Sequence, residues 1–257
     1  MTEAEPPAAR RDEVLPTFSP RLFRWFCRYL RRYFRKHFTG VRLHRAHDGS
    51  RLEGRPVVVY TNHPSWWDPI FFMLLHAHAF PGRRLHGPMD AKALEKYRFM
   101  KKLGIFGIDL DSSGGARTFL RTSRAVLARP DAAFWITAQG RFSDVRERPV
   151  ALAPGLAHLA RSVPELVIQP VAVEYPFWNE RHPEALAWFG EPVVPAEEPA
   201  LSERLASIRD ALPRDVLILA AGPGVAEIEM PFGVGRVDSY AAFADVIRHR
   251  TSRLAAG

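Results

Sequence analysis

The segment TNHPSWWDP, residues 61–69, places a histidine and an aspartate between two apolar runs, RPVVVY and IFFMLLHAHAF. Connections at the ends of buried strands are where catalytic side chains usually lie. A turn between His63 and Asp68 would bring the carboxylate onto the imidazole ring, where it fixes the tautomer and leaves the other ring nitrogen as a general base near neutral pH. The residues therefore suggest a His–Asp dyad. The spacing alone is weak evidence, because such pairs recur by chance and an aspartate before proline is often only a helix cap.

Short apolar runs alternate with helical patterns in the chain beyond Gly40, and this alternation predicts an α/β fold. We expect a single layered domain with a mostly parallel or mixed sheet covered by helices, preceded by an amphipathic N-terminal helix. The expected strands are 56–61, 104–110, 132–137, 166–174 and 187–194, and the expected helices are 67–80, 91–102, 114–129, 152–162 and 201–212. In this arrangement the first strand delivers Asn62 and His63 to the edge of the sheet, and Asp68 begins the next helix.

The 257 residues are enough for one medium-sized domain with a short appendage. Residues 1–17 have the composition of a disordered tail, 18–40 form a basic amphipathic helix, and 41–257 form the main domain. The single cysteine, Cys27, excludes an intramolecular disulfide and favours a reducing compartment.

The positive charge is concentrated at the N-terminus. Residues 1–45 hold eleven Lys and Arg residues against four acidic ones, a net charge of +7, whereas the remaining 212 residues carry a net charge of only +1. The segment RLFRWFCRYLRRYFRKHF, residues 21–38, follows a predicted N-cap, Ser19, and Pro20 at the first helical position. Its predicted apolar side comprises Leu22, Phe26, Tyr29, Leu30, Tyr33 and Phe34, with Phe23, Trp25 and Phe38 at the margins.

Three partners are open to this helix: an anionic membrane surface, its own domain, or nucleic acid. Basic residues near an anionic bilayer contribute about 1 kcal/mol each, so reversible anchoring is the interpretation that we favour. Charges recur too often for a signal peptide, and no apolar run approaches the roughly 20 residues of a spanning helix. No nucleic-acid recognition motif accompanies the charge, so we expect no nucleic acid. We expect peripheral (monotopic) attachment to the cytoplasmic face of a membrane.

A succession of short blocks resembles the glycerolipid acyltransferase family, which includes lysophosphatidic acid acyltransferases. The blocks are NHPSWWDP, MDAKALEKYRFMKKLGIFGIDLD, FWITAQGRFSD, LAPGLAHLA, VIQPVAVEY and FGEPV, in the order that the family keeps. The likeness spans residues 55–195, and the family pattern NHxxxxD matches Asn62, His63 and Asp68.

The resemblance implies transfer of an acyl group from a thioester, on coenzyme A or acyl carrier protein, to a lipid hydroxyl without a covalent enzyme intermediate. The donor is a co-substrate, and no cofactor or metal is expected to be bound. This fits a chain that has no GxSxG and whose one cysteine lies in the amphipathic helix. His63 would act as the base and Asp68 as its partner, with backbone amides near Gly140 as a candidate oxyanion hole.

Departures from the family pattern concern the acceptor. The second block normally closes with an arginine that is thought to hold a phosphate, and here Leu110 and Asp111 follow Asp109. The third block normally reads proline, glutamate, glycine, threonine, arginine, whereas this chain has Ala138, Gln139, Gly140, Arg141 and Phe142.

Two interpretations of the acceptor follow. Either Arg141 binds an acceptor phosphate from a shifted loop, helped by Lys92, Lys101 or Lys102, or the acceptor carries no phosphate ester. We favour the second, which predicts a glycolipid, a carotenoid glycoside or an amino lipid. The lysine-rich segment 92–102 is a candidate site for coenzyme A phosphates or an acidic carrier protein, and equally for a solvated helix face.

Two other functions compete with acyl transfer to lipid. Gln139 in place of glutamate favours a lipid-binding protein that keeps the scaffold without catalysis. A thioester hydrolase, in which His63 activates water, would use the same dyad.

Overall fold

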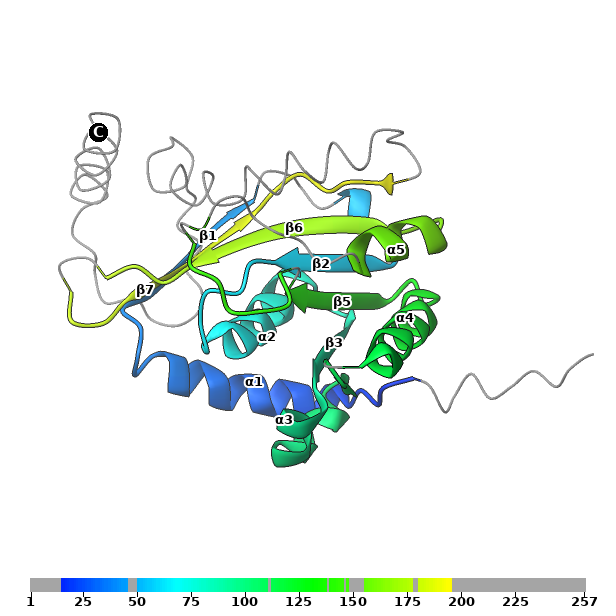
Figure 1. Ribbon diagram of the computed structural model, residues 1–257. Helices are drawn as coiled ribbons and strands as arrows, with labels where there is room; N and C mark the ends of the chain where they lie inside the picture. The colour runs from blue at the N-terminus through cyan, green and yellow to red at the C-terminus, as the bar shows by residue number, and fades with distance from the viewer. Residues whose placement is uncertain are drawn as a thin grey trace, which may run out of the picture.

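The computed structural model describes residues 15–45, 50–110, 112–137, 139–145, 147, 155–177 and 180–195. This part of the chain contains one seven-stranded sheet with the order β1-β7-β6-β2-β5-β3-β4 (Figure 1). The strands are β1 (Gly40–Arg45), β2 (Val57–Thr61), β3 (Arg84–Asp90), β4 (Ile105–Ile108), β5 (Ala132–Thr137), β6 (Val167–Glu174) and β7 (Glu184–Phe189). Paired strands are parallel except β6 and β7, which are antiparallel. The predicted α/β fold with a mixed sheet is confirmed.

Helices cover both faces of the sheet. The α-helices are α1 (Pro20–Phe34), α2 (Asp68–Ala79), α3 (Ala91–Lys96), α4 (Ser113–Leu127) and α5 (Gly155–Ser162), and 3-10 turns lie at η2 (Ser50–Leu52) and η3 (Arg98–Lys102). Central strand β2 is buried on both sides, and its alternate side chains enter different cores. Val57 and Val59 pack in the core that includes α1 and α2, whereas Val58 and Tyr60 pack in the core that includes α4 and α5. The C-terminal end of β2 is therefore rigidly held.

Two strands were missing from the expected set. β1 carries a charged residue, Arg42, which is buried because its guanidinium forms two 2.8 Å hydrogen bonds with the Glu184 carboxylate on β7. β3 reads RLHGPMD, and its glycine and proline indicate a loop rather than a strand. In the fold, Glu184, which is 142 residues away in the chain, neutralises Arg42 of β1. Strand β3 is stabilised by its pairing with β4 and β5. Neither kind of contact is visible in the local sequence pattern.

Other boundaries moved by a few residues. The predicted helix 91–102 divides at Tyr97 into α3 and η3, and the predicted strand 187–194 is realised as β7, after which Val193 forms an isolated bridge with Ile168. The predicted helix 201–212 lies outside the described residues, as do residues 1–14 of the predicted tail. Thr17, at the end of that tail, accepts a 2.9 Å hydrogen bond from Gly104 N–H, so this end belongs to the fold.

Helix α1 begins as predicted, since Ser19 caps it by accepting a hydrogen bond from Leu22 N–H and Pro20 is its first residue. It packs on its own domain with a face rotated from the predicted one. The buried residues are Phe23, Cys27, Leu30 and Phe34. Tyr29, which was expected on the apolar side, is 54% exposed. Across the ranges that the structure describes, no helix has the length and apolar character needed to cross a membrane.

His76 on α2 has a structural environment. The Trp135 indole N–H donates to His76 Nδ1 over 3.2 Å, which leaves the Nε2 hydrogen to donate to the Arg83 carbonyl over 3.1 Å. Burial lowers the pKa of His76 to about 4. The imidazole is therefore neutral at physiological pH and links α2 to β5.

Candidate active site

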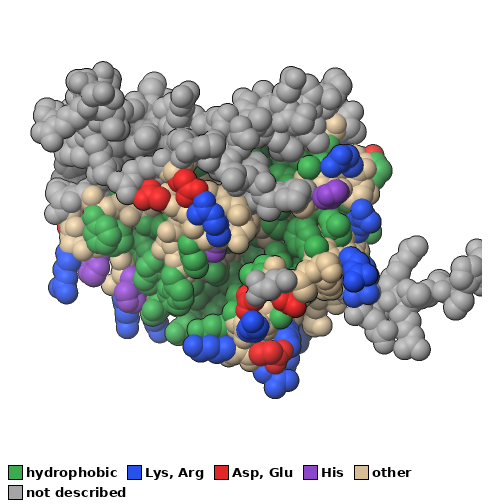
Figure 2. All heavy atoms as spheres, viewed as in Figure 1, with side chains coloured by type: hydrophobic (Ala, Val, Ile, Leu, Met, Phe, Trp, Pro, Cys, Tyr) green, Lys and Arg blue, Asp and Glu red, His purple; other side chains and the backbone are tan. Residues whose placement is uncertain are grey.

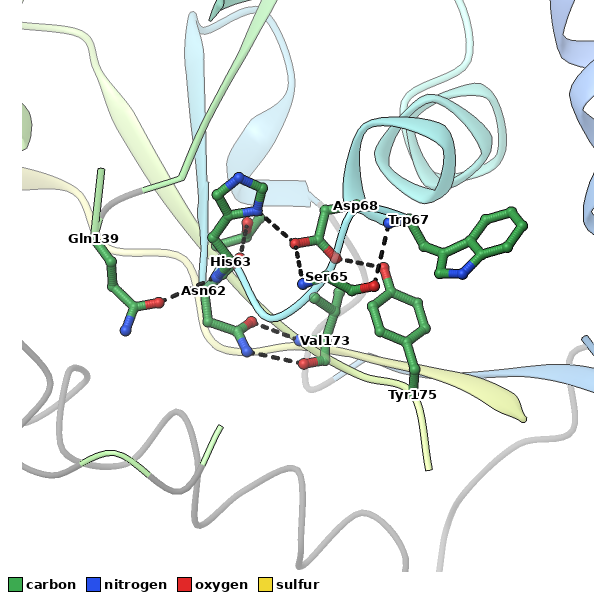
Figure 3. Close-up of polar contacts among 9 residues, drawn as sticks. Asn62, His63, Ser65, Trp67, Asp68, Gln139, Val173 and Tyr175 are labelled. Carbon is green, nitrogen blue, oxygen red and sulfur yellow. Dashed lines mark hydrogen bonds and ion pairs between the residues drawn. The ribbon is translucent and has the colours of Figure 1, made fainter. Parts of the chain in front are cut away.

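The structure brings His63 and Asp68 together at the carboxyl end of β2. The connection 62–67 turns back on itself, and Asp68 begins α2, so the His63 Nδ1 atom lies 2.6 Å from Asp68 Oδ2 (Figure 3). Asp68 is fully buried, and its other partners are the Ser65 N–H at 3.1 Å and the Tyr175 hydroxyl at 2.6 Å. A carboxylate that accepts from an amide and a ring nitrogen on one oxygen fixes the imidazole hydrogen on Nδ1.

The opposite edge of the imidazole is open. The His63 side chain is 18% exposed, and no residue in the described ranges forms a hydrogen bond with its Nε2 atom. In Figure 3 this atom points away from the carboxylate. The geometry therefore presents an unprotonated nitrogen to a substrate, which is the arrangement that general base catalysis requires.

Asn62 lies beside the dyad and holds the backbone. Its side-chain amide donates to the Val173 carbonyl over 2.9 Å, and its side-chain oxygen accepts from Val173 N–H over 2.8 Å. This pair of hydrogen bonds extends the contact between β2 and β6 past the last paired residues (Figure 3). The sequence assigned Asn62 to substrate binding, and the structure shows it positioning the segment that carries His63.

The loop after β5 also holds His63. Gln139 Oε1 accepts a 3.1 Å hydrogen bond from His63 N–H, and Ser143 N–H donates to the His63 carbonyl over 3.0 Å. Gln139 thus supplies an acceptor oxygen to the dyad's backbone, a role that an amide fulfils without charge. Gly140 has φ of +69°, which suits glycine, and its N–H donates to the Thr137 carbonyl over 3.0 Å. The Gly140 amide is therefore occupied within the turn.

Arg141 and Phe142 follow in the same loop, with opposite relations to the dyad. The Arg141 guanidinium forms an ion pair with Glu147. The Phe142 ring stacks on the His63 imidazole, with ring centroids 4.1 Å apart and an interplanar angle of 28°. Phe142 is 57% exposed and stands where the family pattern has its arginine. An apolar ring, rather than a cation, therefore borders the candidate base.

The predicted lysines, Lys92, Lys101 and Lys102, lie on α3 and η3. Lys92 is exposed in the first turn of α3, which Asp90 caps by accepting from Ala93 N–H over 2.8 Å. Lys101 pairs with Glu95. Leu110 is exposed, and Asp111 and Ala138 lie outside the described residues. Within the described ranges Lys92 makes no hydrogen bond or ion pair with the segment 62–68.

Sequence reasoning did not identify Tyr175 or the role of Phe142. Tyr175 follows β6 in the block VIQPVAVEY, where an aromatic residue after an apolar strand usually indicates core packing. The sequence pattern identified Phe142 only as the residue at the position where the family has an arginine. Their contacts with Asp68 and His63 join residues 107 and 79 positions apart, which no local pattern reveals.

Comparisons with known proteins agree with this geometry. The Acyltransferase family model matches residues 40–174, more than half of the chain. The crystal structure of the 1-acyl-sn-glycerophosphate (LPA) acyltransferase PlsC from Thermotoga maritima is similar in fold, with a TM-score of 0.55 and 13% sequence identity over 79% of this chain and 81% of that one. The sequence has no significant match among curated proteins. On the family match, which includes β2, the connection 62–67 and β6, this chain belongs to the acyltransferase family.

Proposed function

We propose that this protein is an O-acyltransferase that moves a fatty acyl group from acyl-CoA or acyl-ACP to a hydroxyl of a membrane lipid. The observation that carries the proposal is the His63–Asp68 pair, with Nδ1 and Oδ2 2.6 Å apart and Nε2 open to a substrate. Membership of the acyltransferase family supports the reaction class. No serine or cysteine nucleophile is needed, because the acceptor hydroxyl can attack the thioester directly.

In the proposed reaction His63 Nε2 removes the proton of the acceptor hydroxyl as its oxygen bonds to the thioester carbonyl carbon. Asp68 stabilises the imidazolium that forms, since its carboxylate already holds the Nδ1 hydrogen. The tetrahedral intermediate then breaks its carbon–sulfur bond, and the proton on His63 passes to the departing thiolate. The products are the lipid ester and the free thiol, and the enzyme returns to its starting state.

Developing charge on the thioester oxygen requires hydrogen-bond donors. The Gly140 and Ser143 amides donate to backbone carbonyls. The amides of Arg141 and Phe142 make no hydrogen bond with any residue in the described ranges and lie in the loop that borders His63. We therefore assign the oxyanion donors to these two amides in place of Gly140.

The acceptor that we favour is uncharged or zwitterionic, in the class of a glycolipid, a carotenoid glycoside or an amino lipid. The Arg141 guanidinium is neutralised by Glu147, and Phe142 occupies the position beside His63 that a phosphate-binding arginine would need. Without a further cation beside His63 among the residues that the structure describes, a phosphate monoester would lose its hydration there without a compensating ion pair.

Radiolabelled acyl-CoA, and separately acyl-ACP, incubated with a total lipid extract from the host tests the proposed function. A labelled lipid that forms with wild type and not with His63→Ala supports acyl transfer, and mass spectrometry identifies the acceptor. Free fatty acid formed at one rate with or without lipid would instead establish a thioester hydrolase. Lipid binding with no product from either donor would favour a non-catalytic lipid-binding protein.

Phe142→Arg should raise the rate with a phosphate-bearing acceptor, such as lysophosphatidic acid, about tenfold relative to the natural acceptor. A guanidinium beside His63 would offer a charge-assisted hydrogen bond, which is worth roughly 1.5 kcal/mol or more. The measurement is kcat/KM for both acceptors in competition. Phe142→Leu is the matched control, because it removes the ring without adding charge and should leave the preference unchanged. A preference that Phe142→Arg does not alter would contradict this account of the acceptor.

The same proposal includes peripheral attachment to an anionic membrane surface. The outward side of α1 continues into an aromatic surface, which we define by Trp25, Phe26, Tyr29, Tyr33, Trp66 and Phe99. Its Phe26 and Phe99 rings are 5.2 Å apart, and Tyr33 reaches Trp67 at 5.7 Å, next to the segment that carries His63. On the face of the molecule shown in Figure 2, hydrophobic side chains form a patch, and Lys and Arg side chains lie along its lower border. Such a surface suits the membrane interface, where rings enter and cations meet lipid phosphates.

Arg24→Glu with Arg28→Glu should weaken binding to anionic vesicles at least about tenfold, since each basic residue near the surface contributes about 1 kcal/mol. Vesicle flotation at several phosphatidylserine contents measures the effect. Arg117→Glu with Arg121→Glu on α4 changes the same charge on another exposed helix and should bind as wild type does. Deletion of α1 is a poorer test, because it would expose the core that Phe23 and Leu30 cover. If the α1 double variant and the α4 double variant floated equally with anionic vesicles, the assignment of the α1 surface to membrane binding would be wrong.

A further inference from the structure

We infer that Tyr175 is a positioning residue of the dyad, whose hydroxyl holds the Asp68 carboxylate in place and limits the affinity of the His63–Asp68 pair for a proton. The inference rests on the proposed function only for its kinetic consequence. Tyr175 follows β6, and its hydroxyl oxygen lies 2.6 Å from Asp68 Oδ1 (Figure 3). The second oxygen, Oδ2, receives His63 Nδ1 and Ser65 N–H. Three elements, β2, α2 and the end of β6, therefore meet at one carboxylate.

The hydroxyl of Tyr175 is the donor in this contact. Burial, with the nearby Asp68 charge, raises the pKa of Tyr175 well above its ordinary value, so the hydroxyl keeps its hydrogen. The ring is held between aromatic neighbours, with Phe38 at 5.6 Å and Phe71 at 5.8 Å between ring centroids. A donor fixed by its own packing restrains the carboxylate, and this is the condition for an aligned dyad.

Loss of the hydroxyl would change the electrostatics of the pair. Asp68 is fully buried, so an Oδ1 without a donor keeps its charge without compensation. The carboxylate would then attract a proton more strongly, whether that proton is held on His63 or on Asp68 itself. Because both distributions raise the proton affinity of the coupled pair, the unprotonated base would appear only at higher pH.

Other ionisable groups lie on the elements around the dyad. They are Tyr33 and His37 on and after α1, Arg141, Asp144 and Glu147 after β5, and Glu174 on β6. Arg141 pairs with Glu147, and His37 Nδ1 bonds to the Tyr33 carbonyl. Of the ionisable side chains in the described ranges, Tyr175 and His63 alone form a hydrogen bond or ion pair with Asp68.

Tyr175→Phe tests the inference, because it removes one oxygen and keeps the ring. The expected result is that the titration midpoint of His63, followed by NMR of labelled imidazole in the full chain, moves to higher pH by roughly half a unit or more. The acid limb of kcat/KM should move with it, and the lost rate should return as the pH rises. Tyr60→Phe is the matched control, since Tyr60 is a buried tyrosine whose hydroxyl has no partner in the described ranges. It should leave the midpoint where wild type has it.

A folded Tyr175→Phe protein with the wild-type midpoint would overturn the inference, even if its activity fell at every pH, since a uniform loss indicates packing alone. Site-specific 3-fluorotyrosine at position 175 provides a second measurement should the phenylalanine variant not fold. Its more acidic hydroxyl is a stronger donor, so the midpoint should move to lower pH, and no movement would again contradict the inference. The NMR titration needs no substrate, so it decides the role of Tyr175 even if no acyl acceptor is found.

Discussion

His63→Ala should lower acyl transfer about 10²–10⁴-fold, the usual contribution of a general base. The imidazole is the group that presents an open nitrogen beside the Phe142 ring, while Asp68 holds its other nitrogen at 2.6 Å. Without it the acceptor hydroxyl must lose its proton to water, whereas the donor can still occupy its site. The loss should therefore appear in kcat, with KM for the acyl donor changed little.

Single-turnover assays at saturating donor, together with a binding titration of a non-hydrolysable acyl-CoA analogue, would separate the two parameters. His158→Ala is the matched control, because His158 is an exposed histidine on α5 and has no contact with the dyad. Activity of His63→Ala within a factor of a few of wild type would remove His63 as the base. It would then give the scaffold a binding role, as the glutamine at position 139 had suggested.

The part of the site that the sequence predicted is local in the chain. His63 and Asp68 are five residues apart, and an apolar strand before them and a helix start after them determine where both side chains lie. The same pattern gave the cores of β2, β5 and β6, because strands buried on both faces are continuous apolar runs. The predictions of element type that rested on such continuous apolar runs were therefore the most reliable.

Features that depend on distant contacts were not predictable from one sequence. The charge of Arg42 interrupts the apolar pattern of β1, and Glu184 on β7, which neutralises it, lies 142 residues away in the chain. The face of α1 was misplaced because aromatic residues surround that helix, and periodicity alone could not tell which of them α2 would cover. Exposure of Tyr29 and burial of Cys27 follow from docking rather than from hydropathy.

The loop after β5 illustrates the same limit within the site. Gln139 departs from the family's glutamate, and this departure motivated the competing hypothesis of a lipid-binding protein without catalysis. In the structure its side-chain oxygen accepts from His63 N–H over 3.1 Å, and that role requires an acceptor oxygen but no charge. The substitution is therefore compatible with an intact dyad, and the proposed assay decides between the two functions.

Asp68→Asn should lower kcat about 10²–10³-fold and leave KM unchanged, because Asp68 is fully buried and acts through His63. The Ser65 N–H at Oδ2 favours an orientation in which the amide oxygen replaces Oδ2 and the NH₂ group faces Tyr175. His63 would then keep its hydrogen on Nδ1, so the loss should reflect the missing charge that stabilises the imidazolium rather than a wrong tautomer. A loss near 10⁴-fold would instead indicate that the amide had turned over and that the tautomer had changed.

A double-mutant cycle tests whether the two residues act as one unit. If Asp68 contributes only through His63, the double variant His63→Ala with Asp68→Asn should be no slower than His63→Ala alone. Asp90→Asn is the control for a carboxylate at a helix start, since Asp90 caps α3 by accepting from Ala93 N–H. Asparagine caps a helix about as well as aspartate, so this change should alter neither stability nor kcat appreciably. Additive losses in the double variant would show that Asp68 also acts independently of His63. Its complete burial gives it no direct access to substrate, so such a loss would have to come from the fold of the connection that Ser65 and Tyr175 share with it.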